Sequence, residues 1–262
     1  MKSPDGKTNP AWYDVVSIPD YPAPPAGNHA CDVCVVGAGI AGLTSAYLLA
    51  KAGKSVVVLD EGPIASGQSG RTSAHLASEI DDRFIEIERL HGEANAKLAY
   101  ESHAAAIDLI ERIARDEQID CDFRRLDAYL FPLPSDPPDL LGREWAAAKR
   151  AGFRVAELLE QHSLRAWDPS PCIRFGDQGR FHPLKYLVGL TKALDRLGVK
   201  IYTGCRVKDV SGAEPKKGTP PIATVDEGAA KFEASGGIVV ATNTPAPIND
   251  WFGIYTKQAP YR

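Results

Sequence analysis

The stretch that decides the fold covers residues 33–53 and reads VCVVGAGIAGLTSAYLLAKAG. Its first 18 positions carry no charge, and about that many apolar residues can cross a bilayer as a helix. Three glycines within six of these positions would each destabilise such a helix by about 1 kcal/mol relative to alanine. The run before the glycines is short and valine-rich, and the residues after them place apolar side chains on one helical face. The stretch therefore predicts a strand, a glycine turn and a helix, with no membrane span.

The glycine turn has the spacing of a dinucleotide-binding motif, G-x-G-x-x-G. In this motif the first glycine allows the tight turn, the second lets a pyrophosphate approach the backbone, and the third lets the helix pack closely on the strand. The N-terminus of the helix adds free N–H groups and a partial positive charge. The candidate phosphate site is therefore the whole turn, which consists of Gly37, Ala38, Gly39, Ile40, Ala41 and Gly42.

A second apolar strand completes the βαβ unit. Residues 54–62 read KSVVVLDEG, so this strand ends in Asp60 and Glu61. A carboxylate at this position accepts hydrogen bonds from the ribose hydroxyls of a dinucleotide. Asp60 is the predicted ribose ligand, with Glu61 as its neighbour at the site. A βαβ unit that binds no ligand is the alternative.

The composition is that of a protein that acts on small molecules. The chain has 262 residues and a formal net charge of -4, with its lysines and arginines dispersed. Such a charge distribution does not favour a nucleic-acid surface. The N-terminal region is rich in proline and lacks the basic region, apolar core and cleavage site of a signal peptide. We therefore expect a cytoplasmic protein with no nucleic-acid partner.

The five cysteines are typical of reduced thiols rather than of a disulfide framework. Cys31 and Cys34 form a C-x-x-C motif, for which redox chemistry or metal binding is the alternative interpretation. Cys34 falls inside the predicted strand, and no second Cys or His pair follows at the spacing of a zinc site. The sequence predicts no metal site.

The segment after the second strand distinguishes between cofactors. Residues 62–81 form a loop of glycine, serine and threonine with one arginine, Arg71, where a nicotinamide-binding domain would continue into further strand–helix units. Such a loop can donate hydrogen bonds to a second stretch of phosphate and to a flavin edge. It favours FAD over a nicotinamide cofactor, although spacing alone makes Arg71 a surface cation.

The chain resembles the FAD-dependent amino-acid and amine oxidoreductases of the D-amino-acid oxidase superfamily, and within it those with a C-terminal Rieske iron–sulfur domain. The motifs of this resemblance are CDVCVVGAGIAGLTSAYLLAKAGKSVVVLDEG, GRTSAHL, FHPLKYLVGL, VVATNTP and KQAPYR. The resemblance implies an α/β fold with a Rossmann-like FAD-binding domain, a ββα three-layer sandwich, and an inserted α+β substrate domain. Its implied segments are an arm (1–30), a first FAD segment (31–90), a substrate insertion (91–176), a second FAD segment (177–244) and a truncated second substrate segment (245–262).

The resemblance also assigns roles to residues. It implies that the glycine turn binds the FAD pyrophosphate and that Asp60 binds the adenosine ribose. The other positions that match the family are a second cofactor loop of Arg71, Thr72 and Ser73, the adenine contact Val207 and the pyrophosphate contact Thr242.

Two histidines are candidates for flavin contact. His75 follows the cofactor loop closely enough to reach the flavin, and His182 is the weaker candidate; the alternative for both is a hydrogen-bonded packing role. The flavin itself takes the hydride in amine oxidation, so a protein base is not required. The sequence therefore identifies no catalytic residue.

The predicted function is an FAD-dependent oxidoreductase that takes a hydride from a small amine or amino-acid-like donor onto flavin N5. A Rieske domain outside this chain is the implied electron-transfer partner, because the cysteines here lack the paired Cys-x-His pattern of such a cluster. A nicotinamide-dependent dehydrogenase and a catalytically incomplete dinucleotide-binding fragment are the alternatives. We expect an N-terminal portion, since the family's last FAD segment has no counterpart before residue 262.

Overall fold

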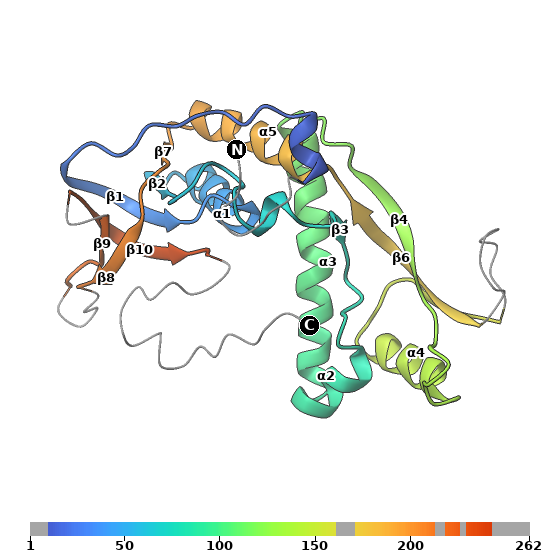
Figure 1. The fold of residues 1–262 in the computed structure, drawn as a ribbon. Helices are drawn as coiled ribbons and strands as arrows, with labels where there is room; N and C mark the ends of the chain where they lie inside the picture. The colour runs from blue at the N-terminus through green and yellow to red at the C-terminus, as the bar shows by residue number, and fades with distance from the viewer. Residues whose placement is uncertain (1–9, 161–170, 213–217, 226–228, 243–262) are drawn as a thin grey trace. The chain divides into compact units, whose positions relative to one another are not determined.

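A computed structural model describes residues 10–160, 171–212, 218–225 and 229–242. The chain forms two compact units, which Figure 1 shows with their helices and strands labelled. The first unit combines Met1–Thr72 with Pro183–Arg262, and the second is Ser73–His182. The second unit is thus inserted in the sequence of the first.

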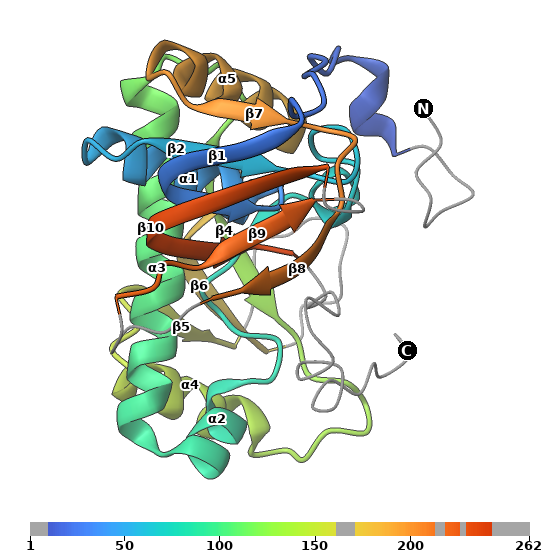
Figure 2. The same cartoon turned by 90° about the vertical axis from the view of Figure 1, so that its left-hand side faces the viewer.

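The first unit is built on a six-stranded sheet with the order β7-β2-β1-β10-β9-β8 (Figure 2). Strands β1, β2, β7 and β10 are parallel, whereas β8 and β9 continue the sheet as antiparallel strands. The bounds of these strands are β1 Gly27–Val36, β2 Val56–Leu59, β7 Lys200–Tyr202, β8 Val207–Ser211, β9 Ile222–Val225 and β10 Ala230–Val240.

Apolar side chains cover both faces of the parallel strands. On one face Val36 and Leu59 share a buried cluster with Val207 of β8, Val225 of β9 and Phe232 of β10. The alternating positions of β1 and β2 point to the other face, where helix α1 (Ile40–Lys51) contacts both strands and helix α5 (Pro183–Arg196). The predicted α/β fold and Rossmann-like layering are confirmed.

Strand β1 starts earlier than the sequence indicates. The predicted arm extends to residue 30, but β1 begins at Gly27 and pairs in parallel with the start of β10. Its first residues are largely exposed and polar, so they carry no apolar signal. The ring of His29 stacks on Phe232 with the centroids 4.9 Å apart. The early pairing therefore depends on a partner far away in the sequence.

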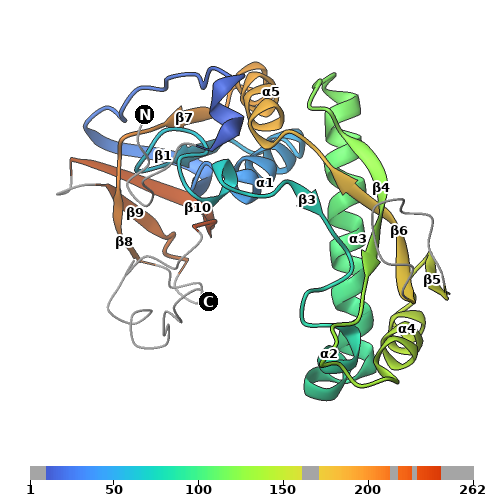
Figure 3. The ribbon, with the colours of Figure 1, turned by 45° about the vertical axis from the view of Figure 1, so that its right-hand side comes forward.

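The second unit combines an antiparallel sheet with three helices (Figure 3). Strand β6 pairs with β3, β4 and β5, and α3 packs its buried alanine and isoleucine stripe near β6. The stretches EANAKLAYESHAAAIDLIERIARD and DLLGREWAAAKRAG have helical patterns and CDFRRLDAYLFP is strand-like. They predict α3, α4 and β4, whereas α2, β5 and β6 have no such signal. The bounds are β3 His75–Leu76, α2 Phe84–His91, α3 Glu93–Asp116, β4 Arg124–Leu130, α4 Leu140–Arg150, β5 Ala156–Leu159 and β6 Cys172–Arg180.

Helix α2 depends on a buried acid from another helix. The side chain of Glu144, in α4, is 2% exposed and accepts hydrogen bonds from the backbone N–H groups of Phe84 (2.8 Å) and Ile85 (3.1 Å). A carboxylate at the N-terminus of a helix satisfies free donors and interacts favourably with the helix dipole. Phe84 also packs edge-on against Phe153, 6.0 Å between centroids. These contacts join α2 and α4 in one core.

The unit borders differ from the predicted domain borders. The structure divides the chain after Thr72 and after His182, whereas the sequence places these borders after residues 90 and 176. The difference arises because β3 pairs with the end of β6 and the N–H of Ser78 donates to Oε1 of Gln178 at 2.6 Å. The predicted segment 245–262 lies outside the described residues. No helix in the described ranges has both the length and the apolar character to cross a membrane.

The two helical glycines of α1 and α4 allow a matched test of the fold. A Cβ at Gly42 would lie 1.8 Å from the carbonyl oxygen of Gly37, whereas a Cβ at Gly142 meets no atom within 4 Å. Gly42→Ala is expected to lower the free energy of unfolding by about 1–3 kcal/mol through overpacking. Gly142→Ala is expected to raise it by about 0.5–1 kcal/mol through helix propensity. Urea denaturation measures both free energies of unfolding. Equal changes in the two variants would contradict the close packing of α1 on the turn.

Candidate cofactor site

The glycine turn lies where three parallel strands end. The N–H of Gly37 donates to the carbonyl of Leu59 at the end of β2 (2.8 Å), and the N–H of Ala241 donates to Val36 at the end of β1 (2.8 Å). Helix α1 begins at Ile40, directly after the turn. Ligands of open α/β sheets bind at this carboxyl edge of the strands. The six predicted residues of the turn are thus brought together at one edge of the first unit.

Ser69 completes this edge from the loop after β2. Its Oγ accepts a hydrogen bond from the N–H of Ile40 at 3.0 Å, and a Cβ added at Gly39 would lie 2.8 Å from the same oxygen. The hydroxyl therefore occupies the N-terminus of α1, and a side chain at position 39 would displace it. In the sequence, the only signal for Ser69 is its place in the serine- and glycine-rich loop.

Asp60 is part of the site and Glu61 points elsewhere. The carboxylate of Asp60 accepts hydrogen bonds from the N–H groups of Ala38 (2.6 Å) and Gly62 (2.8 Å). Burial raises the pKa of Asp60, and the two backbone hydrogen bonds offset part of the increase. The side chain of Glu61 is 70% exposed, with Oε2 3.7 Å from Nε of Arg206. Each Asp60 oxygen keeps a lone pair for a further donor.

Two half-buried residues of the first unit have buried polar atoms that make no hydrogen bond among the described residues. Nε and Nη2 of Arg71 and Oγ1 of Thr242 are buried, and none of them has a hydrogen-bond partner among the described residues. Buried N–H donors that have no acceptor destabilise the folded chain. Both residues follow sheet strands of the first unit along the chain, Thr242 directly after β10. These atoms match an anionic ligand with hydrogen-bonding oxygens.

The other predicted positions are divided between the two units. Thr72 belongs to the first unit, and its carbonyl accepts a hydrogen bond from Nε1 of Trp12 at 3.0 Å. Val207 is buried at the start of β8. Ser73 and His75 are exposed residues of the second unit, where His75 lies opposite Arg180 in the β3–β6 ladder.

The sequence profile of the FAD dependent oxidoreductase family matches residues 32–252. The chain belongs to this family. It is 30% identical over 203 residues to the putative Rieske 2Fe-2S iron-sulfur protein YhfW of Bacillus subtilis, covering 78% of this chain and 39% of the relative. It is also 30% identical over 190 residues to gamma-glutamylputrescine oxidoreductase of Escherichia coli, covering 71% of this chain and 44% of the relative. This FAD-dependent oxidoreductase chain therefore spans less than half the length of these two proteins.

Solved structures show the same fold. Glycine oxidase from Geobacillus kaustophilus matches with a TM-score of 0.66 and 20% identity, over 84% of this chain and 57% of that one. L-proline dehydrogenase from P. horikoshii matches with a TM-score of 0.67 and 19% identity, over 88% of this chain and 58% of that one. The predicted family and fold are confirmed.

FAD fits the polar groups of the first unit. The cofactor of this oxidoreductase family has two phosphates, and the buried Arg71 guanidinium offers N–H donors that lack an acceptor in the described chain. The small residues of the turn leave the backbone open to a close approach. At the edge of the sheet, the Asp60 carboxylate oxygens can accept further hydrogen bonds beside the one from Ala38. The prediction of FAD is confirmed by family membership.

His182 and the cysteines show no feature of a reactive centre. His182 is buried in the second unit, and its backbone N–H donates to the carbonyl of Cys121 at 2.6 Å. All five cysteines are buried free thiols, and burial raises the pKa of Cys31 to about 11, so this thiol is protonated at neutral pH. Within the described ranges no three His, Cys, Asp or Glu side chains are arranged as a metal site.

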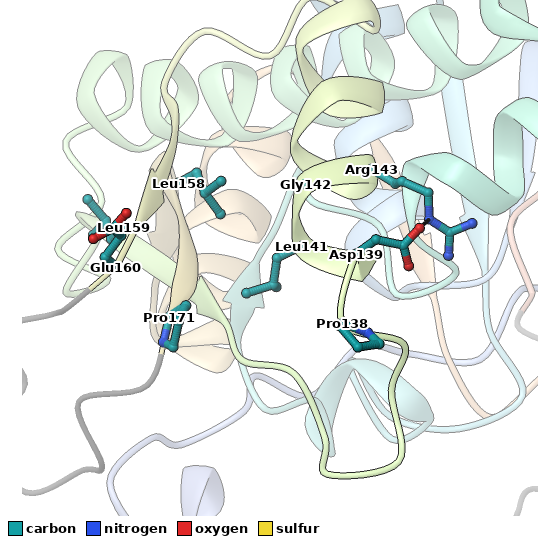
Figure 4. Close-up of a pocket in the computed structure, with 9 residues that line it drawn as sticks. All are labelled: Pro138, Asp139, Leu141, Gly142, Arg143, Leu158, Leu159, Glu160 and Pro171. Atoms are coloured by element: carbon teal, nitrogen blue, oxygen red, sulfur yellow. Dashed lines mark ion pairs between the residues drawn. The ribbon is translucent and has the colours of Figure 1, made fainter.

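A groove of about 490 Å³ lies in the second unit between α4 and β5 (Figure 4). Leu141 and Leu158 line it together with two prolines, and Asp139 pairs with Arg143 at 3.1 Å at its side. No residue of the glycine turn or of the 65–72 loop lines this groove. The groove and the candidate cofactor site therefore have no residue in common.

Glu79 is a buried acid of the second unit. Its Oε2 is buried and has no hydrogen-bond partner in the described part of the chain. Burial raises the pKa of Glu79 to about 7, its own backbone N–H offsets part of the increase, and the Asp81 carboxylate adds to it. The folded protein therefore binds a proton here that the unfolded chain releases near its ordinary pKa of 4.5.

This acid makes stability depend on pH in one direction. Because the folded pKa is raised, stability falls as pH rises from about 4.5 to about 7. Glu79→Gln removes this dependence, so the variant is expected to have a Tm equal to or below that of the wild type at pH 4.5 and above it at pH 8. Asp82→Asn, an exposed control nearby, is expected to show no such change between the two pH values. A Tm difference between Glu79→Gln and the wild type that stays constant with pH would contradict a raised pKa of Glu79.

Proposed function

We propose that this chain is the FAD-binding part of an oxidoreductase that oxidises small amines or amino acids. Family membership supports the reaction class. The names of gamma-glutamylputrescine oxidoreductase, glycine oxidase and L-proline dehydrogenase describe amine or amino-acid substrates of those proteins. The observation that carries the proposal is the pair of buried Arg71 nitrogens, Nε and Nη2, which lack an acceptor in the described chain and belong to the same unit as the glycine turn.

Each group of the first unit has a proposed role toward FAD. The N–H groups of the turn and the Arg71 guanidinium bind the pyrophosphate, and Thr242 Oγ1 donates to one of its oxygens. Asp60 accepts from the adenosine ribose while it keeps its hydrogen bond to Ala38. The backbone of Val207 contacts the adenine. Glu61 has no role in this proposal, because its exposed side chain pairs with Arg206.

FAD supplies the redox chemistry by accepting the hydride of the donor C–H bond at N5. The protein residues hold the cofactor and exclude water from its phosphates. The loop residues Thr72 and Ser73 and the imidazole of His75 remain proposed contacts of the cofactor. A Rieske domain outside this chain is the proposed electron acceptor, as the name of the Bacillus subtilis relative suggests. We place the enzyme in the cytoplasm, since its five cysteines are free thiols.

The test is a titration of the purified chain with FAD, followed by anaerobic addition of amines and amino acids. The proposal predicts a bound-flavin absorption spectrum, which a primary or secondary amine or an amino acid bleaches. Gly39→Ala is expected to weaken FAD binding roughly 5- to 150-fold, because its Cβ would lie against Ser69 Oγ and in the path of the pyrophosphate.

Gly67→Ala is the matched control, because a Cβ at that loop position meets no atom within 4 Å. It is expected to bind FAD like the wild type. Binding of a nicotinamide dinucleotide in place of FAD would refute the proposed cofactor site. A flavin that binds and is reduced only by donors without an amine would overturn the substrate class alone.

A further inference from the structure

The segment before β1 contacts the loop that carries Arg71. This segment contains a short 3₁₀ helix, η1 (Ala11–Asp14), which packs on α5. Nε1 of Trp12 donates to the carbonyl of Thr72 at 3.0 Å, and the hydroxyl of Tyr13 donates to the carbonyl of Ala65 at 2.9 Å. The two acceptors are the two ends of the 65–72 loop. Two adjacent aromatic residues thus hold both ends of one loop.

The loop adopts a conformation that needs such support. Ala65 has φ = 62°, a left-handed backbone that a residue with a Cβ rarely adopts. Gly70 is buried, and a Cβ at this position would lie 2.6 Å from both the Ala65 carbonyl oxygen and the Tyr13 hydroxyl. The Tyr13 hydroxyl therefore contacts the loop at Gly70 as well, directly before Arg71.

The Tyr13 hydroxyl is a neutral donor beside the arginine. Burial raises the pKa of Tyr13, and the positive charge of Arg71 offsets part of the increase. The phenol is therefore protonated at neutral pH and leaves the guanidinium charge unneutralised. Tyr13 fixes the backbone next to Arg71 without competing with an anionic ligand for it.

The segment that carries Trp12 and Tyr13 also makes hydrogen bonds that do not involve the loop. Farther along the same segment, the hydroxyl of Tyr21 donates to Oδ2 of Asp195 at 2.9 Å. The N–H of Thr203 donates to the carbonyl of Pro22 at 3.1 Å, and its Oγ1 donates to the carbonyl of Tyr21 at 2.7 Å. The segment is thus also fixed at Tyr21 and Pro22, by hydrogen bonds to the end of α5 and to the residue after β7.

We propose that Trp12 and Tyr13 are positioning residues that hold the 65–72 loop, and with it Arg71, in the geometry that binds FAD. The inference rests on the proposed function, and it adds that FAD affinity depends on a segment outside the βαβ unit. Neither side chain has to touch the cofactor. If the aromatic residues only covered apolar surface, their loss would lower stability and leave the cofactor affinity unchanged.

The experiment compares FAD binding by the full chain in three variants that keep an aromatic ring. Trp12→Phe and Tyr13→Phe each remove one hydrogen bond to the loop, and each is expected to raise the Kd for FAD about five-fold. Tyr21→Phe removes a phenol hydrogen bond from the same segment away from the loop and is expected to leave the Kd unchanged. Circular dichroism checks that all three variants are folded.

A second readout needs no cofactor. Trypsin cleaves after arginine, so the rate of cleavage between Arg71 and Thr72, followed by mass spectrometry, reports the order of the loop. We expect faster cleavage at this bond in Trp12→Phe and Tyr13→Phe and the wild-type rate in Tyr21→Phe. Added FAD is expected to slow this cleavage in the wild type more than in the two loop variants.

The outcomes separate this inference from the proposed function. If the wild type binds FAD and the two loop variants match it in Kd and in cleavage rate, the positioning role is overturned and the proposed function stands. If the wild type binds no FAD, the proposed function fails, and the inference that rests on it fails with it. An equal loss of affinity in Tyr21→Phe would show a general effect of the segment and overturn the specific role of the pair.

Discussion

The close packing of helix α1 on the end of strand β1 is the constraint from which the candidate site follows. Gly42 lies so near the carbonyl of Gly37 that a Cβ there would be 1.8 Å from its oxygen. This contact fixes where α1 starts and therefore where its first N–H groups point. Two further side chains then use that edge: Asp60 accepts from Ala38, and Ser69 accepts from Ile40. Hydrogen bonds to Asp60, which follows β2, and to Ser69, in the next loop, thus fix the turn.

The charges of this edge complement a dinucleotide. The carboxylate of Asp60 lies among backbone donors, and its pKa is raised by burial, so the charged form depends on the two N–H groups that it accepts from. Arg71, unlike Asp60, has no hydrogen-bond partner for its buried Nε and Nη2 in the described chain. In the proposed site, FAD provides ribose hydroxyls for the Asp60 carboxylate and phosphate oxygens for the Arg71 guanidinium. One ligand then supplies hydrogen-bond partners to both side chains.

Local patterns predict the parts of this fold whose partners are near in sequence. The valines of β1 and β2, the glycine turn, the terminal Asp60 and the leucine stripe of α5 all show their period or spacing directly. Long-range contacts have no such signal. The polar start of β1 pairs with β10, and Glu144 reaches the N-terminus of α2 from a different helix. Ser69 contacts the glycine turn, and Trp12 and Tyr13 contact the 65–72 loop, through hydrogen bonds that no spacing reveals. Sequence adjacency likewise does not show that the side chain of Glu61 is exposed while that of Asp60 accepts from the turn.

In the proposed site, FAD phosphate oxygens accept hydrogen bonds from the buried Nε and Nη2 of Arg71. The most direct measurement is the Kd for FAD of the wild type and of Arg71→Gln, determined by calorimetry at one salt concentration. Charge-assisted hydrogen bonds contribute about 1.5–3 kcal/mol, so we expect the substitution to raise the Kd roughly 10- to 150-fold. An unchanged Kd in Arg71→Gln, with both proteins folded, would contradict it.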